Sequence, residues 1–296
     1  MHFPPAVLQR ALNERIPPGV RYMVVAAFLF SVMSLFVKLI GPRIPSAQVV
    51  LIRNAFSLGA TYWMLRQAGV RPWGTRRGLL VVRGAVGFVA LLCFFYAIPR
   101  LPLADVTVIQ FTNPVFTALL GAVFLGEYLK RREVALAVLS LLGVVLVAQP
   151  SILFGARAEA LDPQAALIAL AGAVLAAGAY ITIRRLSATE HHLVIVFYFP
   201  LISVPAALPF LWFEAVWPTL TEWALLLGIG VLTQAAQISL TKGLRAERAG
   251  KAMSLSYVQI LFAALWGFLF FGEVPDLLSV LGALLIVGST VLLARS

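Results

Sequence analysis

The stretch VTVIQFTNPVFTALLGAVFLGE, residues 106–127, decides the fold because it is long, apolar and uncharged up to its last residue. About 20 such residues in a helix cross the hydrocarbon core of a bilayer. Gln110, Asn113 and Pro114 interrupt the stretch near its middle, where a bilayer offers no water to satisfy polar groups. The stretch therefore indicates a membrane helix with a polar feature at mid-depth.

The whole chain shares this character. Of its 296 residues, 61% are hydrophobic and 12% charged, with a mean hydropathy of +0.96, whereas soluble domains carry about 25% charged residues. We therefore predict an all-α, polytopic membrane protein with ten transmembrane helices. The predicted spans are residues 21–40, 47–66, 79–99, 104–126, 133–149, 164–184, 192–212, 222–241, 251–271 and 277–294.

The loops between these runs are too short to hold a soluble catalytic domain. HExxH, GxSxG and phosphate-binding glycine loops are absent from the sequence. His191 and His192 have no second cluster with metal-ligand spacing. We therefore expect neither an enzyme nor a cofactor or metal site.

The net charge of +11 is an orientation signal. Alternate loops are basic, as expected where Lys and Arg stay on the cytoplasmic side. This pattern predicts a multi-pass protein of the cytoplasmic (inner) membrane with both termini in the cytoplasm, and it argues against nucleic-acid binding. We expect a monomer. The basic residues of the predicted inner segments are Arg10, Arg15, Arg21, Arg66, Arg71, Arg76, Arg77, Lys130, Arg131, Arg132, Arg184, Arg185, Lys242, Arg245, Arg248, Lys251 and Arg295.

An internal repeat relates the two halves of the chain. FLGE ending at Glu127 and FFGE ending at Glu273 lie 146 residues apart, and the same offset places predicted spans on predicted spans without gaps. Each half, residues 1–150 and residues 151–296, holds five spans, and an odd number inverts the second half in the membrane. Gly126 is expected to end its helix in the left-handed conformation, as is the equivalent glycine of the second half.

Inverted halves offer two equivalent arrangements, one open to each side of the membrane. This symmetry underlies alternating access in many secondary transporters. Some channels also contain inverted repeats. The repeat therefore predicts transport in general and favours a carrier.

These motifs resemble those of a known family. NPVFTALLGAVFLGE and QILFAALWGFLFFGE close the fourth span of each half, and the ten-span pattern covers nearly all of the chain beyond residue 20. In this the chain is similar to the drug/metabolite transporter superfamily, in its EamA-type branch, and among these to bacterial aromatic and neutral amino-acid exporters. The resemblance implies export of small metabolites through a cavity formed partly by spans four and nine. Family members often carry Pro in both halves, whereas Ile260 stands at the second position.

Several polar and aromatic residues at mid-span are candidates for binding a substrate. Amides are costly against lipid and should face protein, water or a ligand. Interhelical hydrogen bonding is the alternative role for each amide, and a packing kink is the alternative for Pro114, the candidate conformational residue. The predicted substrate-binding residues are Gln110, Asn113, Gln237, Gln259, Tyr96, Tyr257, Tyr180 and Gln234.

The positions of the charged residues narrow the predicted class of substrate. The acids lie at span ends, and a buried carboxylate of the kind that proton-driven cation efflux uses is not visible. Lys38, Arg53 and Arg83 could attract a substrate carboxylate, although long cations near span ends also reach the headgroups. We therefore predict a secondary exporter of aromatic or neutral amino acids, or similar small metabolites, with membrane lipid as its surroundings. A multidrug efflux carrier is the alternative among transporters. A membrane enzyme or sensor is the alternative from a different functional class.

Overall fold

The computed structural model describes residues 17–40, 43–98, 100–101, 103–150, 153, 162–211, 215–272 and 274–295. Within these ranges the long elements are all helices, as predicted. Residues 1–16, Glu273 and Ser296 lie outside the described part. The helices are α2 (Pro18–Ile40), α3 (Ser46–Gln67), α4 (Arg77–Ala97), α5 (Leu103–Gln110), α6 (Asn113–Leu125), α7 (Arg131–Ala148), α9 (Pro163–Leu186), α10 (His192–Leu211), α11 (Leu220–Ala246), α12 (Ala249–Leu255), α13 (Val258–Phe271) and α14 (Leu277–Ala294).

The ten predicted spans each correspond to one helix or to a pair of consecutive helices. Among the described residues, eight segments are long and apolar enough to cross a membrane by length and composition. The other two predicted spans are α3 and α7, and α7 begins with the charged residues Arg131, Arg132 and Glu133. The chain is thus a polytopic helical membrane protein.

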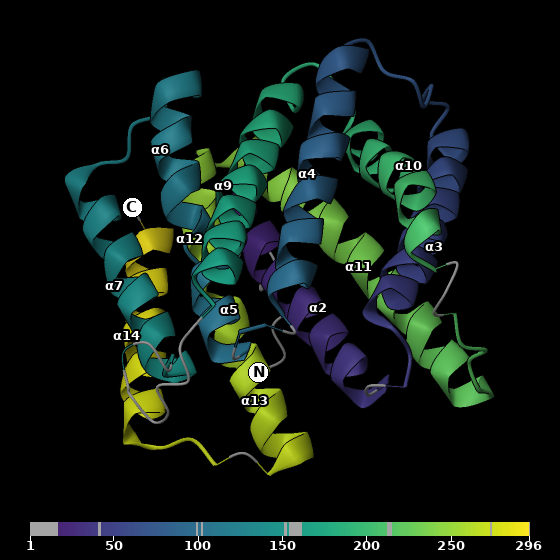
Figure 1. Cartoon of the computed structure of the whole chain (residues 1–296). Coiled ribbons are helices and arrows are strands. Elements are labelled where there is room, and N and C mark those ends of the chain that lie inside the picture. Colours follow the sequence, from purple (N-terminus) through teal and green to yellow (C-terminus); the bar gives the residue numbers. More distant parts are fainter. Residues whose placement is uncertain are drawn as a thin grey trace, which may run out of the picture.

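The two halves of the chain pack on each other with the symmetry that the repeat predicts. Helix α2 packs extensively on α11, and α9 packs extensively on α4. Helix α9 is the equivalent of α2 at an offset of 146 residues, and α11 is the equivalent of α4, so the two contacts are related by the repeat. The same shift relates the contact of α13 with α2 to the contact of α6 with α9. Figure 1 shows α2 and α9 running in opposite directions, so the second half is inverted.

Two predicted spans are broken near their middle. Helix α5 ends at Gln110 and α6 begins at Asn113, while α12 ends at Leu255 and α13 begins at Val258. Pro114 has no N–H with which to bond the Gln110 carbonyl. The Asn113 side chain replaces that donor, with its Nδ2 donating to the Gln110 carbonyl oxygen at 2.8 Å.

The second break forms without a proline. Ser256 Oγ donates to the Met253 carbonyl oxygen at 2.6 Å, just as Thr112 Oγ1 donates to the Ile109 carbonyl oxygen at 2.6 Å. In both halves a hydroxyl therefore adds a second hydrogen bond to a carbonyl at the break that also accepts the backbone N–H of the same residue.

Both broken spans end as the repeat predicts. Gly126 and Gly272 follow α6 and α13 with φ of 65° and 66°, in the left-handed region that glycine adopts without steric cost. The predicted helix ends are confirmed at these two glycines.

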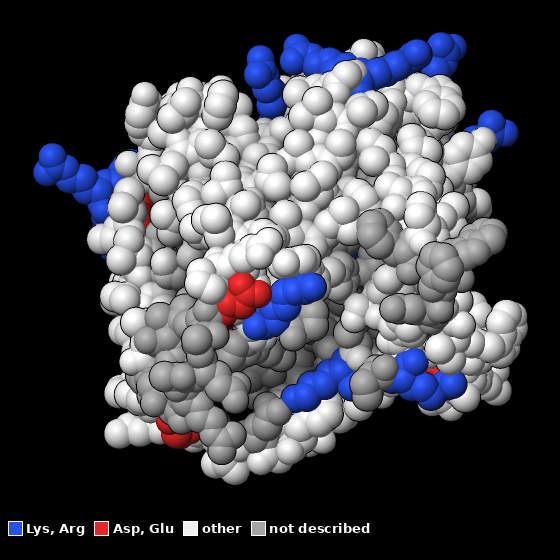
Figure 2. All heavy atoms as spheres, in the orientation of Figure 1, with Lys and Arg blue, Asp and Glu red and all other residues white. Residues whose placement is uncertain are grey.

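Basic side chains gather at one end of the bundle, along the upper edge in Figure 2. The starts of α4 and α7 and the end of α9 lie at this end. Val20 of α2 and Leu293 of α14 join one core cluster with Leu244 near the end of α11, so the described chain starts and ends at the same side. We call this side the basic face. Its exposed basic residues include Arg71, Arg76, Arg77, Arg131, Arg132 and Arg185.

At each end of the bundle, a loop is bonded to the start of a helix, and the two loops and the two helices correspond to each other in the repeat. At the basic face, Glu190 accepts from the backbone N–H groups of Thr75 at 2.8 Å and Arg76 at 2.6 Å. Although burial raises the pKa of Glu190, these hydrogen bonds outweigh it and hold that pKa below its ordinary value. At the opposite face, Arg43 pairs with Glu222 in the first turn of α11.

Glycines allow α7 and α14 to approach closely. A Cβ at Gly282 would lie 2.6 Å from the Gly143 carbonyl oxygen, and a Cβ at Gly143 would lie 2.7 Å from the Gly282 carbonyl oxygen. Backbone atoms cannot rotate away from such a clash. Nearby, the hydroxyls of Ser140 and Ser289 share a hydrogen bond of 2.6 Å between the same helices.

We expect Gly282→Ala to lower the free energy of unfolding by about 1–3 kcal/mol, because overpacking forces the two backbones apart. Thermal unfolding of the detergent-solubilised protein measures this. Gly288→Ala in the same helix is the matched control, since no atom lies within 4 Å of its added Cβ. Equal stability of both variants would contradict the close α7–α14 contact.

Candidate functional site

The two helix breaks meet between the halves of the protein. The rings of Phe111 and Tyr257 lie 6.0 Å apart between centroids, and these two residues are equivalent in the repeat. Each follows the last turn of the first helix in its broken span. The breaks therefore contact each other at the place where the two inverted halves are related by symmetry.

Some polar atoms at this meeting point have no hydrogen-bond partner among the residues that the structure describes. Asn113 is buried, and its Oδ1 has no hydrogen-bond donor. The hydroxyl of Tyr257, on a fully buried side chain, also lacks a partner. Gln110 and Gln259, beside the two breaks, are half-buried. Buried polar groups are normally paired, so unpaired ones at one place mark a site that water or a ligand can complete.

The amides of α11 divide into two kinds. Gln234 is engaged by α3: its Oε1 accepts from Ser57, and its Nε2 donates to Thr61 Oγ1 at 2.7 Å. Gln237 is different, because its buried Oε1 has no donor. The hydrogen bonds of Gln234 favour the interhelical role that was the alternative for each amide, whereas Gln237 retains capacity for a ligand.

The remaining candidate tyrosines lie on α4 and α9. Arg100 stacks 3.8 Å above the ring of Tyr96 and donates to its carbonyl oxygen at 2.9 Å, at the end of α4 away from the basic face. Tyr180 of α9 is half-buried and lies within electrostatic range of Arg83.

Two arginines, Arg53 of α3 and Arg83 of α4, lie inside the bundle and are not paired with an acid among the described residues. Arg83 is buried and lies 4.8 Å from the ring of Phe199, and Arg53 is half-buried. The Nε atoms of both are enclosed without an acceptor. Neither guanidinium pairs with a carboxylate among the described residues. In the sequence, Arg53 stands about two turns into its predicted span, whereas Arg83 was expected near a span end, where reaching the headgroups is ordinary.

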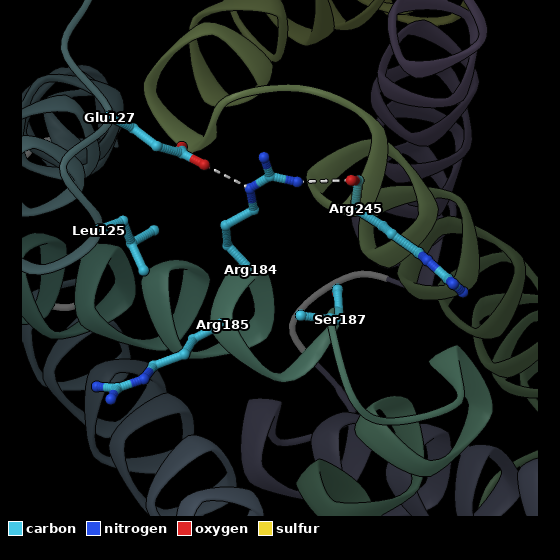
Figure 3. A pocket seen from close by; sticks show the side chains of 7 residues that line it. Leu125, Glu127, Arg184, Arg185, Ser187 and Arg245 are labelled. Atoms are coloured by element: carbon cyan, nitrogen blue, oxygen red, sulfur yellow. Dashed lines mark hydrogen bonds and ion pairs between the residues drawn. The ribbon is translucent and has the colours of Figure 1, made fainter.

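A pocket of about 510 Å³ opens at the basic face. Figure 3 shows Arg184 between the carboxylate of Glu127 and the carbonyl oxygen of Arg245. The lining residues are Leu125, Glu127, Arg184, Arg185, Ser187, Ala188 and Arg245.

Glu127 connects three elements at this pocket. Arg184 Nε of α9 donates to Glu127 Oε1 at 2.7 Å, and the Ala249 N–H at the start of α12 donates to Glu127 Oε2 at 2.8 Å. Arg184 also donates to the Arg245 carbonyl oxygen at 2.5 Å. We call Glu127, Arg184, Arg245 and Ala249 the Glu127 cluster. Glu127 thus reaches the start of α12, a helix of the other half.

A second ion pair reinforces the cluster. Arg248 pairs with the buried Glu133 of α7 and donates to the Tyr128 carbonyl oxygen at 2.7 Å. The connection between α11 and α12 is therefore fastened to the connection between α6 and α7. These contacts tie the two halves together at the basic face.

Comparisons with known proteins agree with this architecture. The model of the EamA-like transporter family matches twice, at residues 17–149 and 163–295. The chain belongs to the EamA-like transporter family. It is thus a membrane transporter of the drug/metabolite transporter superfamily and not an enzyme.

Similar proteins come from bacteria and animals. The pseudopaline exporter CntI of Pseudomonas aeruginosa (strain UCBPP-PA14) is 40% identical over 96% of this chain and 98% of its own. The human solute carrier family 35 member G1 is 29% identical over 92% of the transporter and 78% of its own length. A solved crystal structure with 22% sequence identity superimposes with a TM-score of 0.82, over 94% of this chain and 97% of that chain, and shows the same fold.

We expect Glu127→Ala to loosen the basic face, because it removes the acceptor shared by Arg184 and Ala249. A cysteine at Ser254, buried in α12, should then react with an impermeant maleimide about tenfold faster from that face, as the loss of charge-assisted hydrogen bonds implies. Cys93 is replaced by alanine in this background.

Asp162→Ala is the control, because it removes an acid at the far end of the same helix as Arg184. An unchanged reaction rate in Glu127→Ala, or an equal increase in Asp162→Ala, would contradict the role of the Glu127 cluster.

Proposed function

We propose that this transporter exports small amino-acid-like metabolites across the cytoplasmic membrane by alternating access. The observation that carries the proposal is the meeting of two broken helices from inverted halves, with unpartnered polar atoms at that point. Discontinuous helices at the repeat interface are where many secondary transporters bind their substrates.

The chemistry at the breaks suits a compound with both polar and apolar parts. Asn113 and Gln259, beside the breaks, and Gln237 of α11 present amides, which can donate to a carboxylate and accept from an ammonium group. Gln110 and Tyr257 add a further amide and hydroxyl, and the ring pair of Phe111 and Tyr257 offers an apolar surface. Such a site discriminates compounds by the hydrogen bonds they complete.

The relatives support a small metabolite as cargo. One of them is an exporter of pseudopaline, which makes pseudopaline a compound to test beside aromatic and neutral amino acids. Multidrug efflux is the second candidate. It is disfavoured by Arg53 and Arg83, which have no acidic partner among the described residues and repel lipophilic cations.

The basic face supports an orientation with both termini in the cytoplasm of a bacterial inner membrane. The symmetry of the inverted repeat supports a division into two functional halves, residues 1–150 and residues 151–296. A complete site between the halves of one chain supports a monomeric carrier.

We expect the purified transporter in liposomes to give saturable flux of one or more members of a panel of acidic, neutral and aromatic amino acids and pseudopaline, without ATP. Asn113→Leu together with Gln259→Leu should reduce that flux by roughly tenfold or more, because buried polar groups of the substrate lose partners worth about 1–3 kcal/mol.

Gln67→Leu, at an exposed position at the end of α3, is the control and should retain full flux. Undiminished flux in the double variant would contradict the site. Absence of flux for every member of the panel would contradict the proposed function.

A further inference from the structure

Arg53 and Arg83 occupy related positions in the inverted repeat. Arg83 of α4 faces Phe199 of α10. Phe199 is the repeat equivalent of Arg53, which lies on α3. The contact of α4 with α10 is in turn the repeat image of the contact of α11 with α3. Arg53 and Arg83 therefore stand at equivalent helix contacts in the two halves, on opposite sides of the membrane centre.

Their depths agree with this symmetry. Helix α4 starts at the basic face with Arg77, and six residues later Arg83 lies about 9 Å along the helix. Helix α3 starts at the opposite face with Ser46, and seven residues later Arg53 lies about 10 Å along the helix. Each face of the transporter thus has one arginine at a similar depth.

Arg53 also continues a polar stripe on α3. Ser57 and Thr61 follow it at intervals of four residues, so the three side chains share one helix face. Ser57 and Thr61 hold Gln234 of α11. The stripe directs Arg53 toward α11, which also carries Gln237 with its unpartnered oxygen.

An uncompensated charge within a membrane span is costly and marks a functional site by default. Ion pairs with acidic residues are formed by Arg43, Arg184, Arg248 and Lys251. Lys38 stacks 3.9 Å from the ring of Phe271 and has further contacts. Arg53 and Arg83 lie several residues inside their helices, and no carboxylate among the described residues pairs with either guanidinium.

We infer that Arg83 and Arg53 are carboxylate-binding residues, one on each side of the central amides, and that the transported compound is a net anion. Arg83 receives a carboxylate that enters from the basic face, and Arg53 receives it on the way to the opposite face. Guanidinium groups match carboxylates through paired N–H donors. This inference rests on the proposed function and narrows its substrate class.

The test compares glutamate with glutamine, which differ in one carboxylate. Uptake is measured for the full chain in inside-out and right-side-out membrane vesicles, which expose the two faces separately. The wild-type protein should transport glutamate faster than glutamine. Arg83→Gln should lower the glutamate-to-glutamine ratio about tenfold for entry from the basic face, and Arg53→Gln should do so for entry from the opposite face.

Arg83→Lys and Arg53→Lys keep the charge and should retain most of this preference, which separates a lost anion contact from a folding defect. Arg71→Gln, in an exposed loop of the basic face, is the matched control and should leave the ratio unchanged. As a second measurement, glutamate should raise the unfolding temperature of the detergent-solubilised wild type more than that of the Arg53→Gln, Arg83→Gln double variant.

Faster glutamine than glutamate transport in the wild type, or an unchanged ratio in both Gln variants, would overturn the inference. If neutral members of the panel are transported while glutamate is not, the inference is wrong and the proposed function stands. If no member of the panel is transported, the proposed function itself is wrong.

Discussion

The structure depends on one constraint: within the hydrocarbon core, every backbone group must find its partner inside the protein. Pro114 breaks a membrane helix and leaves the carbonyl of Gln110 without its usual donor, and the side chain of Asn113 supplies one at 2.8 Å. This repair uses the amide nitrogen and leaves the amide oxygen unpaired. The same residue thereby satisfies the backbone and presents an acceptor at the contact between the two halves.

The inverted repeat gives the second half of the chain a corresponding helix break. The second half breaks at the equivalent position without proline, and the two breaks touch through Phe111 and Tyr257. At the basic face, Glu127 fastens α9 and α12 together. Lys38 and Glu273 occupy the repeat-equivalent positions of Arg184 and Glu127 in the sequence. The repeat thus gives the two halves comparable charged residues at corresponding sequence positions, as the proposed alternating access requires.

Much of the fold could be predicted from the sequence because long apolar runs and a repeat offset are one-dimensional signals. Helices at the ten predicted positions and the left-handed Gly126 and Gly272 are confirmed, whereas the two breaks as separate helices were not predicted. The second break could not be predicted because the hydrogen bond from Ser256 to the Met253 carbonyl oxygen depends on a local backbone geometry that no residue pattern predicts. Site residues were harder to predict. Whether Gln234 bonds to α3 or stays free like Gln237, and whether an acid lies near Arg83, are decided by packing between helices far apart in the sequence.

The most direct test of the account measures both ends of the bundle in one experiment. Spin labels at Tyr128 and Arg185 report on the basic face, and labels at the repeat-equivalent Leu39 and Val274 report on the opposite face; all four positions are exposed. Distances are recorded by double electron–electron resonance with and without a transported compound. The account predicts that the two distances change in opposite directions. Changes in the same direction, or constant distances in a protein that still transports, would contradict alternating access between inverted halves.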